Sequence, residues 1–140
     1  MKNLVFLFSF IALALSANAQ IQLKATRAAS GAVSGSTELT VTDAGTDTLF
    51  APSTSKGKLA IFVVTFTRTS GTAGGTATLQ GSIDGTDWVT VGSAYTVTNV
   101  AAATTSFKVL AVDNAFTSWR IIYAGTGTMV NKFRAKVSLF

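Results

Sequence analysis

From residue 20 onward the chain is a series of short segments in which apolar and polar residues alternate, separated by turns rich in glycine and aspartate. Successive side chains of a β-strand point to opposite faces, so a period of two indicates strands with one buried face. Threonine and valine, which are abundant here, fit the pleated surface of a sheet. No helix-period apolar run outweighs these signals. The pattern predicts an all-β fold.

The clearest alternation lies at residues 58–68 and 76–83. In the first segment both faces begin with apolar residues, so we expect a central strand that is covered on both sides at its start. In the second, the odd-numbered residues from Ala77 to Ile83 are expected to face inward. Residues 84–87 then predict a tight hairpin into the next strand.

Segments of this kind recur at intervals of about ten residues, which is typical of antiparallel sandwiches and jelly rolls. We therefore expect a β-sandwich or jelly roll of about 8–10 short strands. The expected strands lie at residues 21–26, 38–42, 48–51, 58–68, 76–83, 88–91, 95–97, 107–112, 119–124 and 129–139.

The first 19 residues have the features of a secretory signal peptide. Lys2 precedes an apolar stretch at residues 4–15, and Ser-Ala-Asn-Ala follows at 16–19. As a helix, that stretch would span only about 18 Å of a bilayer core of about 30 Å. We expect cleavage after Ala19, which leaves no membrane span. The alternative is an uncleaved anchor.

Cleavage would leave one domain at residues 20–140, with a less regular part at 20–56 that contains a glycine- and serine-rich loop. The protein would then act in the periplasm, at the cell surface, outside the cell or on a virion. Charged residues make up only 12% of the whole chain, whose net charge is +5. A typical domain has about 25% charged residues. A surface with so few charges is often covered by neighbouring subunits, so the composition favours an assembly.

The chain contains no histidine and no cysteine. The commonest general base, the commonest metal ligand and the thiol nucleophile are therefore missing, as is the cysteine that anchors a lipoprotein. We expect no catalytic residues and no cofactor. Asp84 and Asp87 are weak candidates for calcium binding, but an Asp-Gly sequence of this kind favours a turn.

Three basic residues, Lys132, Arg134 and Lys136, share one face of the last expected strand. They stand about 6.8 Å apart, and the residues between them are apolar. This row could contact an acidic neighbour or phosphates, or could be a solvated face that prevents edge-to-edge pairing. No aromatic residue lies among them, so nucleic-acid stacking is not expected. A solvated face or a subunit contact is favoured.

Three aromatic residues are candidates for a sugar-binding platform: Trp88, Tyr95 and Trp119. Aromatic rings pack on the apolar faces of sugar rings, but residues of this kind more often belong to the core. Burial is therefore the favoured interpretation.

The segments GTATLQGSIDGTDWVTV at residues 75–91, SWRIIY at 118–123 and GTGT at 125–128 resemble small β-sandwich domains of phage virion proteins. Discoidin-like carbohydrate-binding domains resemble them more loosely. The resemblance covers roughly residues 57–137 and implies a structural or attachment role without catalysis. The signal sequence is unexpected for a virion component and resembles those of secreted Bacteroidetes proteins.

The sequence therefore predicts a non-enzymatic, exported subunit that acts by surface contact in a virion, an appendage or a cell-envelope assembly. Its expected partners are other copies of itself or neighbouring structural proteins. The alternative is a carbohydrate-binding module that uses its surface aromatic residues.

Overall fold

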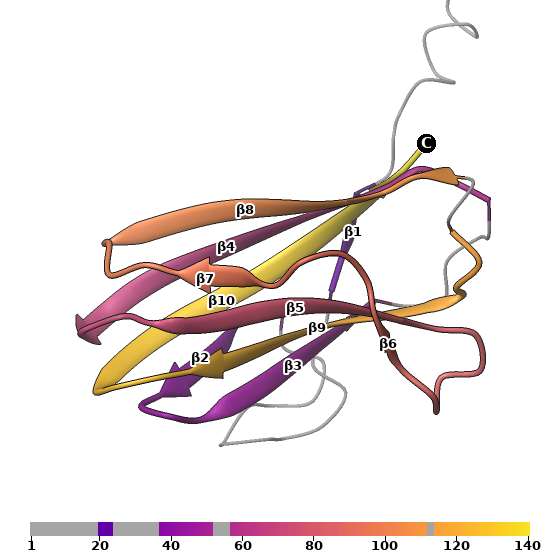
Figure 1. Ribbon diagram of the computed structural model, residues 1–140. Coiled ribbons are helices and arrows are strands. Elements are labelled where there is room, and N and C mark those ends of the chain that lie inside the picture. The colour runs from indigo at the N-terminus through magenta and orange to yellow at the C-terminus, as the bar shows by residue number, and fades with distance from the viewer. Residues whose placement is uncertain (1–19, 24–36, 52–56, 112–113) are drawn as a thin grey trace, which may run out of the picture.

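The computed structural model describes residues 20–23, 37–51, 57–111 and 114–140, which form two antiparallel sheets packed face to face. The all-β prediction is confirmed, and the architecture is a β-sandwich (Figure 1). The signal segment and the predicted loop at residues 28–36 lie outside the described residues. Among those described, no helix is long and apolar enough to cross a membrane.

Sheet A contains β1 (Gln20–Gln22), β2 (Leu39–Thr42), β4 (Ala60–Gly71), β8 (Ala102–Val109) and β10 (Met129–Leu139). Its order is β1-β10-β4-β8, and β2 also pairs with β10. Strand β4 pairs with one edge of β10 along its whole length. Strands β1 and β2 pair with different parts of the other edge.

Sheet B contains β3 (Thr46–Ala51), β5 (Gly75–Ser82), β6 (Val89–Thr90), β7 (Tyr95–Val97) and β9 (Ser118–Gly125). Its order is β3-β9-β5-β6, with β7 also paired to β5. Figure 1 shows β8, β4 and β10 in one layer and β5, β9 and β3 in the other.

The core between the sheets is built around aromatic rings. The ring of Phe66 lies 5.0 Å from that of Tyr123 and 6.3 Å from that of Phe133, measured between centroids. The Tyr123 hydroxyl donates a hydrogen bond to the Gly74 carbonyl oxygen (2.8 Å) and accepts one from Asn131 Nδ2 (2.9 Å). Burial raises the pKa of Tyr123. These bonds satisfy a hydroxyl that would be costly to bury alone.

The prediction for residues 58–68 is half correct. The even-numbered residues from Ala60 to Phe66 are buried, and β4 lies between β10 and β8 in the sheet. The expected cover on its other face is wrong, because Val63 is 40% exposed. Only one face of sheet A packs on sheet B, so the second face of β4 forms part of the outer surface.

The prediction for residues 76–83 fails at its end. Strand β5 stops at Ser82, and Ile83, expected inward, is 62% exposed. The last pair of the hairpin is Gly81 with Val89, so the connection is a longer loop rather than a tight turn. The alternation breaks where the chain leaves the sheet.

The predicted bounds of β7 and β10 are confirmed, whereas β8 begins at Ala102 rather than at residue 107. Residues 102–106 of β8 are small or polar and none of them is fully buried. That half of the strand therefore lacks the apolar alternation that identifies a strand in the sequence.

Candidate functional site

The basic row predicted on the last strand lies on the outer face of sheet A. Arg134 and Lys136 are exposed, while the residues between them and on either side are buried in the core. Lys132 Nζ forms an ion pair with Glu38 Oε1 at 3.1 Å. Strand β10 is paired on both edges, so the row does not protect a sheet edge, contrary to one of the expected roles.

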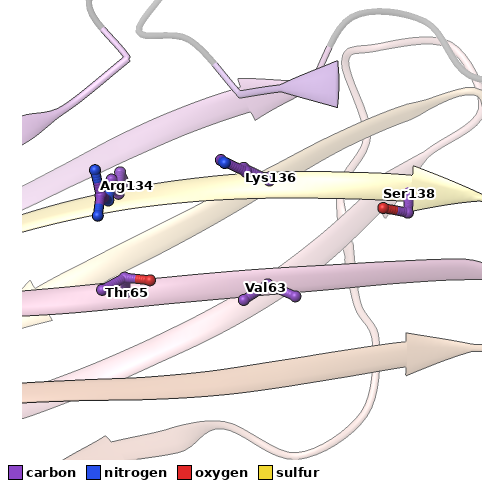
Figure 2. A pocket seen from close by; sticks show the side chains of 5 residues that line it. All are labelled: Val63, Thr65, Arg134, Lys136 and Ser138. Carbon is purple, nitrogen blue, oxygen red and sulfur yellow. The ribbon is translucent and has the colours of Figure 1, made fainter. Parts of the chain in front are cut away.

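A shallow groove runs beside this row, with a volume of about 260 Å³. We call it the basic groove. Figure 2 shows its β10 side chains on one strand and its β4 side chains on the neighbouring strand. Its lining residues are Val63, Thr65, Arg134, Lys136 and Ser138.

Asp84 stabilises the loop between β5 and β6. Its Oδ1 accepts hydrogen bonds from the backbone N–H groups of Thr86 (2.9 Å) and Asp87 (3.0 Å), and from the Ser82 hydroxyl (2.9 Å). The two backbone bonds are the main reason that the pKa of Asp84 is held well below its usual range. In the described part of the chain, no three acidic side chains gather where they could hold a metal ion. The geometry is that of a turn.

The three aromatic candidates lie in different environments. Trp119 is 0% exposed and contacts Phe62 in the core, so its ring offers no face to a ligand. Tyr95 is half-buried and its ring stacks on that of Phe66 at 6.0 Å. Trp88 is half-buried as well, and it contacts residues on the outer face of sheet B. The three rings do not form one platform.

Trp88 is instead the centre of a small cluster on the outer face of sheet B. The guanidinium carbon of Arg120 lies 4.4 Å from the Trp88 ring centroid, and Arg120 Nε donates to Gln80 Oε1 at 2.7 Å. The Phe50 and Trp88 rings form a T-shaped pair with their centroids 5.8 Å apart. We call Phe50, Gln80, Trp88 and Arg120 the Trp88 cluster.

The register of sheet B explains this cluster. Phe50 is the Cα partner of Arg120, which in turn is the partner of Gln80, so the three side chains form a row across β3, β9 and β5. Among the described residues, the terminal N–H groups of Arg120 have no acceptor. Burial lowers the pKa of this guanidinium, which nevertheless stays charged.

A hydroxyl-bearing row lies next to the cluster on the same face. Thr48 and Thr78 flank Ile122 as its Cα partners, and all three are partly exposed. The Trp88 cluster and this row together place two aromatic rings, one positive charge and two hydroxyls on the outer face of sheet B.

Sequence reasoning identified Trp88 but not its partners. Arg120 alternates with the apolar residues Trp119 and Ile121, which places it on the outer face. Phe50 and Gln80 come from distant segments, and only the strand register brings them beside it. A periodic pattern does not encode that register.

A third surface feature is apolar and lies at the loop between β5 and β6. Ile83 and Val89 are 62% and 57% exposed, and with Phe116 they line a shallow cavity of about 320 Å³. Asp84 and Asp87 form its polar side.

Comparison with solved structures finds similar sandwiches. The enzymatically active domain of bacteriophage CBA120 tailspike protein 4 has a TM-score of 0.57 and 11% identity over 74% of this chain and 15% of the tailspike chain. A CBM4 structure has a TM-score of 0.52 and 19% identity, covering 78% of this chain and 74% of that one. CBM28, a carbohydrate-binding module specific for non-crystalline cellulose, has a TM-score of 0.51 and 12% identity, covering 70% and 69%.

No family model matches the sequence, and no curated protein matches it. At the identities given, the structural likeness shows the fold alone. That fold is a β-sandwich similar to carbohydrate-binding modules and to part of a phage tailspike, of which this chain spans about 15%. The phage-virion resemblance of the sequence therefore holds at the level of the fold.

Proposed function

We propose that this protein is a non-enzymatic glycan-binding sandwich that holds a sugar chain at the Trp88 cluster. The observation that carries the proposal is the position of Arg120 against the Trp88 ring. Arg120 is held by a hydrogen bond to Gln80, but its terminal N–H groups have no acceptor among the described residues and are available to a ligand. The likeness in fold to carbohydrate-binding modules supports this choice of ligand class.

The chemistry of the cluster suits a sugar. An aromatic side chain provides a large apolar surface with a fixed orientation, which matches the C–H face of a pyranose ring. The guanidinium presents donors in a planar fork, which suits pairs of hydroxyl oxygens. Because Gln80 already holds Arg120 in place, less conformational entropy is lost when a ligand binds. The hydroxyls of Thr48 and Thr78 extend the surface for further sugar units.

The test is a glycan array followed by calorimetric titration of the best neutral oligosaccharide. We compare the wild-type protein with Trp88→Ala, Trp88→Phe and Arg120→Lys. Removal of a central aromatic contact typically costs about 2 kcal/mol, so Trp88→Ala should weaken binding by about 30-fold. Trp88→Phe should lose less, because it keeps an aromatic face. Arg120→Lys should weaken binding because the fork is lost.

Thr104→Ala serves as the matched control, since Thr104 is exposed on β8 of the opposite sheet. It should bind like the wild-type protein. Each variant is checked by its thermal midpoint, so that a folding defect is not mistaken for lost binding. If Trp88→Ala stays folded and binds with unchanged affinity, or if the wild-type protein binds no glycan, the proposal is wrong.

A second candidate is an exported structural or adhesive subunit of a virion, appendage or envelope assembly, favoured by the exposed apolar residues Ile83 and Val89. Exposed apolar side chains that line one cavity gain free energy when a neighbouring subunit covers them. Light scattering during size-exclusion chromatography should then detect oligomers at high concentration, and Ile83→Ser should reduce them. A protein that stays monomeric throughout excludes self-assembly.

A further inference from the structure

The basic groove on sheet A lies on the face opposite the Trp88 cluster, and nothing in the proposed function uses it. Arg134, Lys136 and Ser138 come from β10, and Thr65 and Val63 lie beside them on β4 (Figure 2). Its walls therefore combine positive charges, hydroxyls and one partly exposed valine.

Charge on this face is poorly balanced. Lys132 is paired with Glu38, but in the described part of the chain Arg134 and Lys136 have no acidic partner. Lys108, exposed on β8, is the Cα partner of Ile61 and adds a further positive charge to the same face of the sheet. Uncompensated charges of one sign raise the local potential and concentrate anions near the surface.

We propose that the basic groove binds a linear anionic polysaccharide, one whose sugar units carry carboxylate or sulfate groups. The Cα atoms of Arg134 and Lys136 are about 6.8 Å apart along the strand, so the two side chains offer separate contacts to the anionic groups of an extended polymer. Thr65, the Cα partner of Arg134, and Ser138, the next outward residue after Lys136, offer hydroxyls to the neutral hydroxyls of the sugar units, and Val63 contacts the C–H surface of a ring. The site goes beyond the Trp88 cluster, because it selects for charge.

A sugar polymer fits this face better than a nucleic acid. Binding of single-stranded nucleic acid relies on aromatic side chains on which the bases stack. The outward-facing residues of β4, β8 and β10 that the structure describes are aliphatic, hydroxyl-bearing or basic, and none is aromatic. The exposed ring of Phe140 follows β10 after Ser138 and does not alternate with the basic residues.

The experiment measures binding of the protein to polygalacturonate, chondroitin sulfate and neutral dextran at low and at physiological salt. The wild-type protein should bind both anionic polymers, prefer them over dextran and lose affinity as salt rises. Arg134→Gln combined with Lys136→Gln should lower affinity roughly tenfold or more, because both paired contacts are lost. The charge-conserving Arg134→Lys should retain most of the binding.

Lys58→Gln is the matched control: Lys58 is exposed, does not line the groove and changes the net charge in the same direction. It should bind almost like the wild-type protein. Trp88→Ala should leave this binding unchanged, which separates the two proposed sites. Equal losses in Lys58→Gln and the double variant, equal binding of dextran, or tighter binding of single-stranded DNA would each overturn the proposal.

Discussion

Asp47 offers the sharpest test of the energetics of this fold. It lies on β3 with its side chain only 2% exposed, and neither carboxylate oxygen has a hydrogen-bond partner in the described part of the chain. Burial raises the pKa of Asp47. A buried polar group without a partner costs about 1–3 kcal/mol, and a charged one costs more. We therefore expect Asp47→Val, which also suits a strand, to stabilise the protein at pH 7 by about 1–3 kcal/mol.

The pH dependence follows from the direction of the shift. Because the folded-state pKa is raised, the folded protein binds this proton more tightly than the unfolded chain does. The stability that Asp47 contributes is present in full below the unfolded pKa of about 3.9 and is lost as pH rises through the raised folded pKa. The advantage of Asp47→Val should therefore be largest at neutral pH and should shrink toward pH 4.

Urea unfolding at a series of pH values measures this effect. For a domain of this size, a gain of 1 kcal/mol raises the thermal midpoint by roughly 3–6 °C, which gives an independent check. The isosteric Asp47→Asn should remove the pH dependence while gaining less stability, since its amide stays unpaired. If Asp47→Val is less stable than the wild-type protein at pH 7, the carboxylate has a stabilising partner and the reasoning is refuted.

Three further predictions concern packing, a glycine and the Asp84 loop. Phe66→Ala should lose about 3–5 kcal/mol in urea unfolding, because a ring that is 1% exposed is removed from the aromatic core; a small loss would contradict that packing. Gly71→Ala should lower the thermal midpoint, since Gly71 has a φ of 71° and an added Cβ would meet the Thr128 carbonyl oxygen. Asp84→Ala should speed hydrogen exchange at the amides of residues 86–87, and unchanged exchange would argue against the loop's dependence on this carboxylate. Because the folded-state pKa of Asp84 is lowered, its carboxylate stabilises the wild-type protein above about pH 3.9, and this stabilisation is lost as pH falls toward the lowered pKa. The Asp84→Ala variant should lack this stabilisation.

The strands were predictable because their alternation is a local property of the chain. The pattern in β10 defines both its bounds and the outward direction of Arg134 and Lys136. Local patterns do not show which face of a strand meets another sheet, so the exposed position of Val63 was not predicted. The exposure of Ile83 was missed because the strand ends one residue earlier than its alternation suggests.

The candidate sites were predictable only in part. Trp88 and the basic row were identified as single residues and as one strand face. The contact of Trp88 with Arg120, and the groove that Arg134 forms with Thr65, depend on pairings between segments far apart in the sequence. Such pairings depend on the register of whole sheets, which the alternation within a single segment does not predict.

Sheet A can be completed only after β10 has been synthesised. Strand β10 follows all other described strands along the chain, yet it is the partner of β1, β2 and β4. Sheet B, in contrast, has all of its strands once β9 has been made. Pairing between distant segments slows folding, and unpaired strand edges invite aggregation. A chain that is interrupted before residue 129 therefore leaves β1 and β2 without their partner strand, and we expect it to aggregate rather than to form a smaller sandwich.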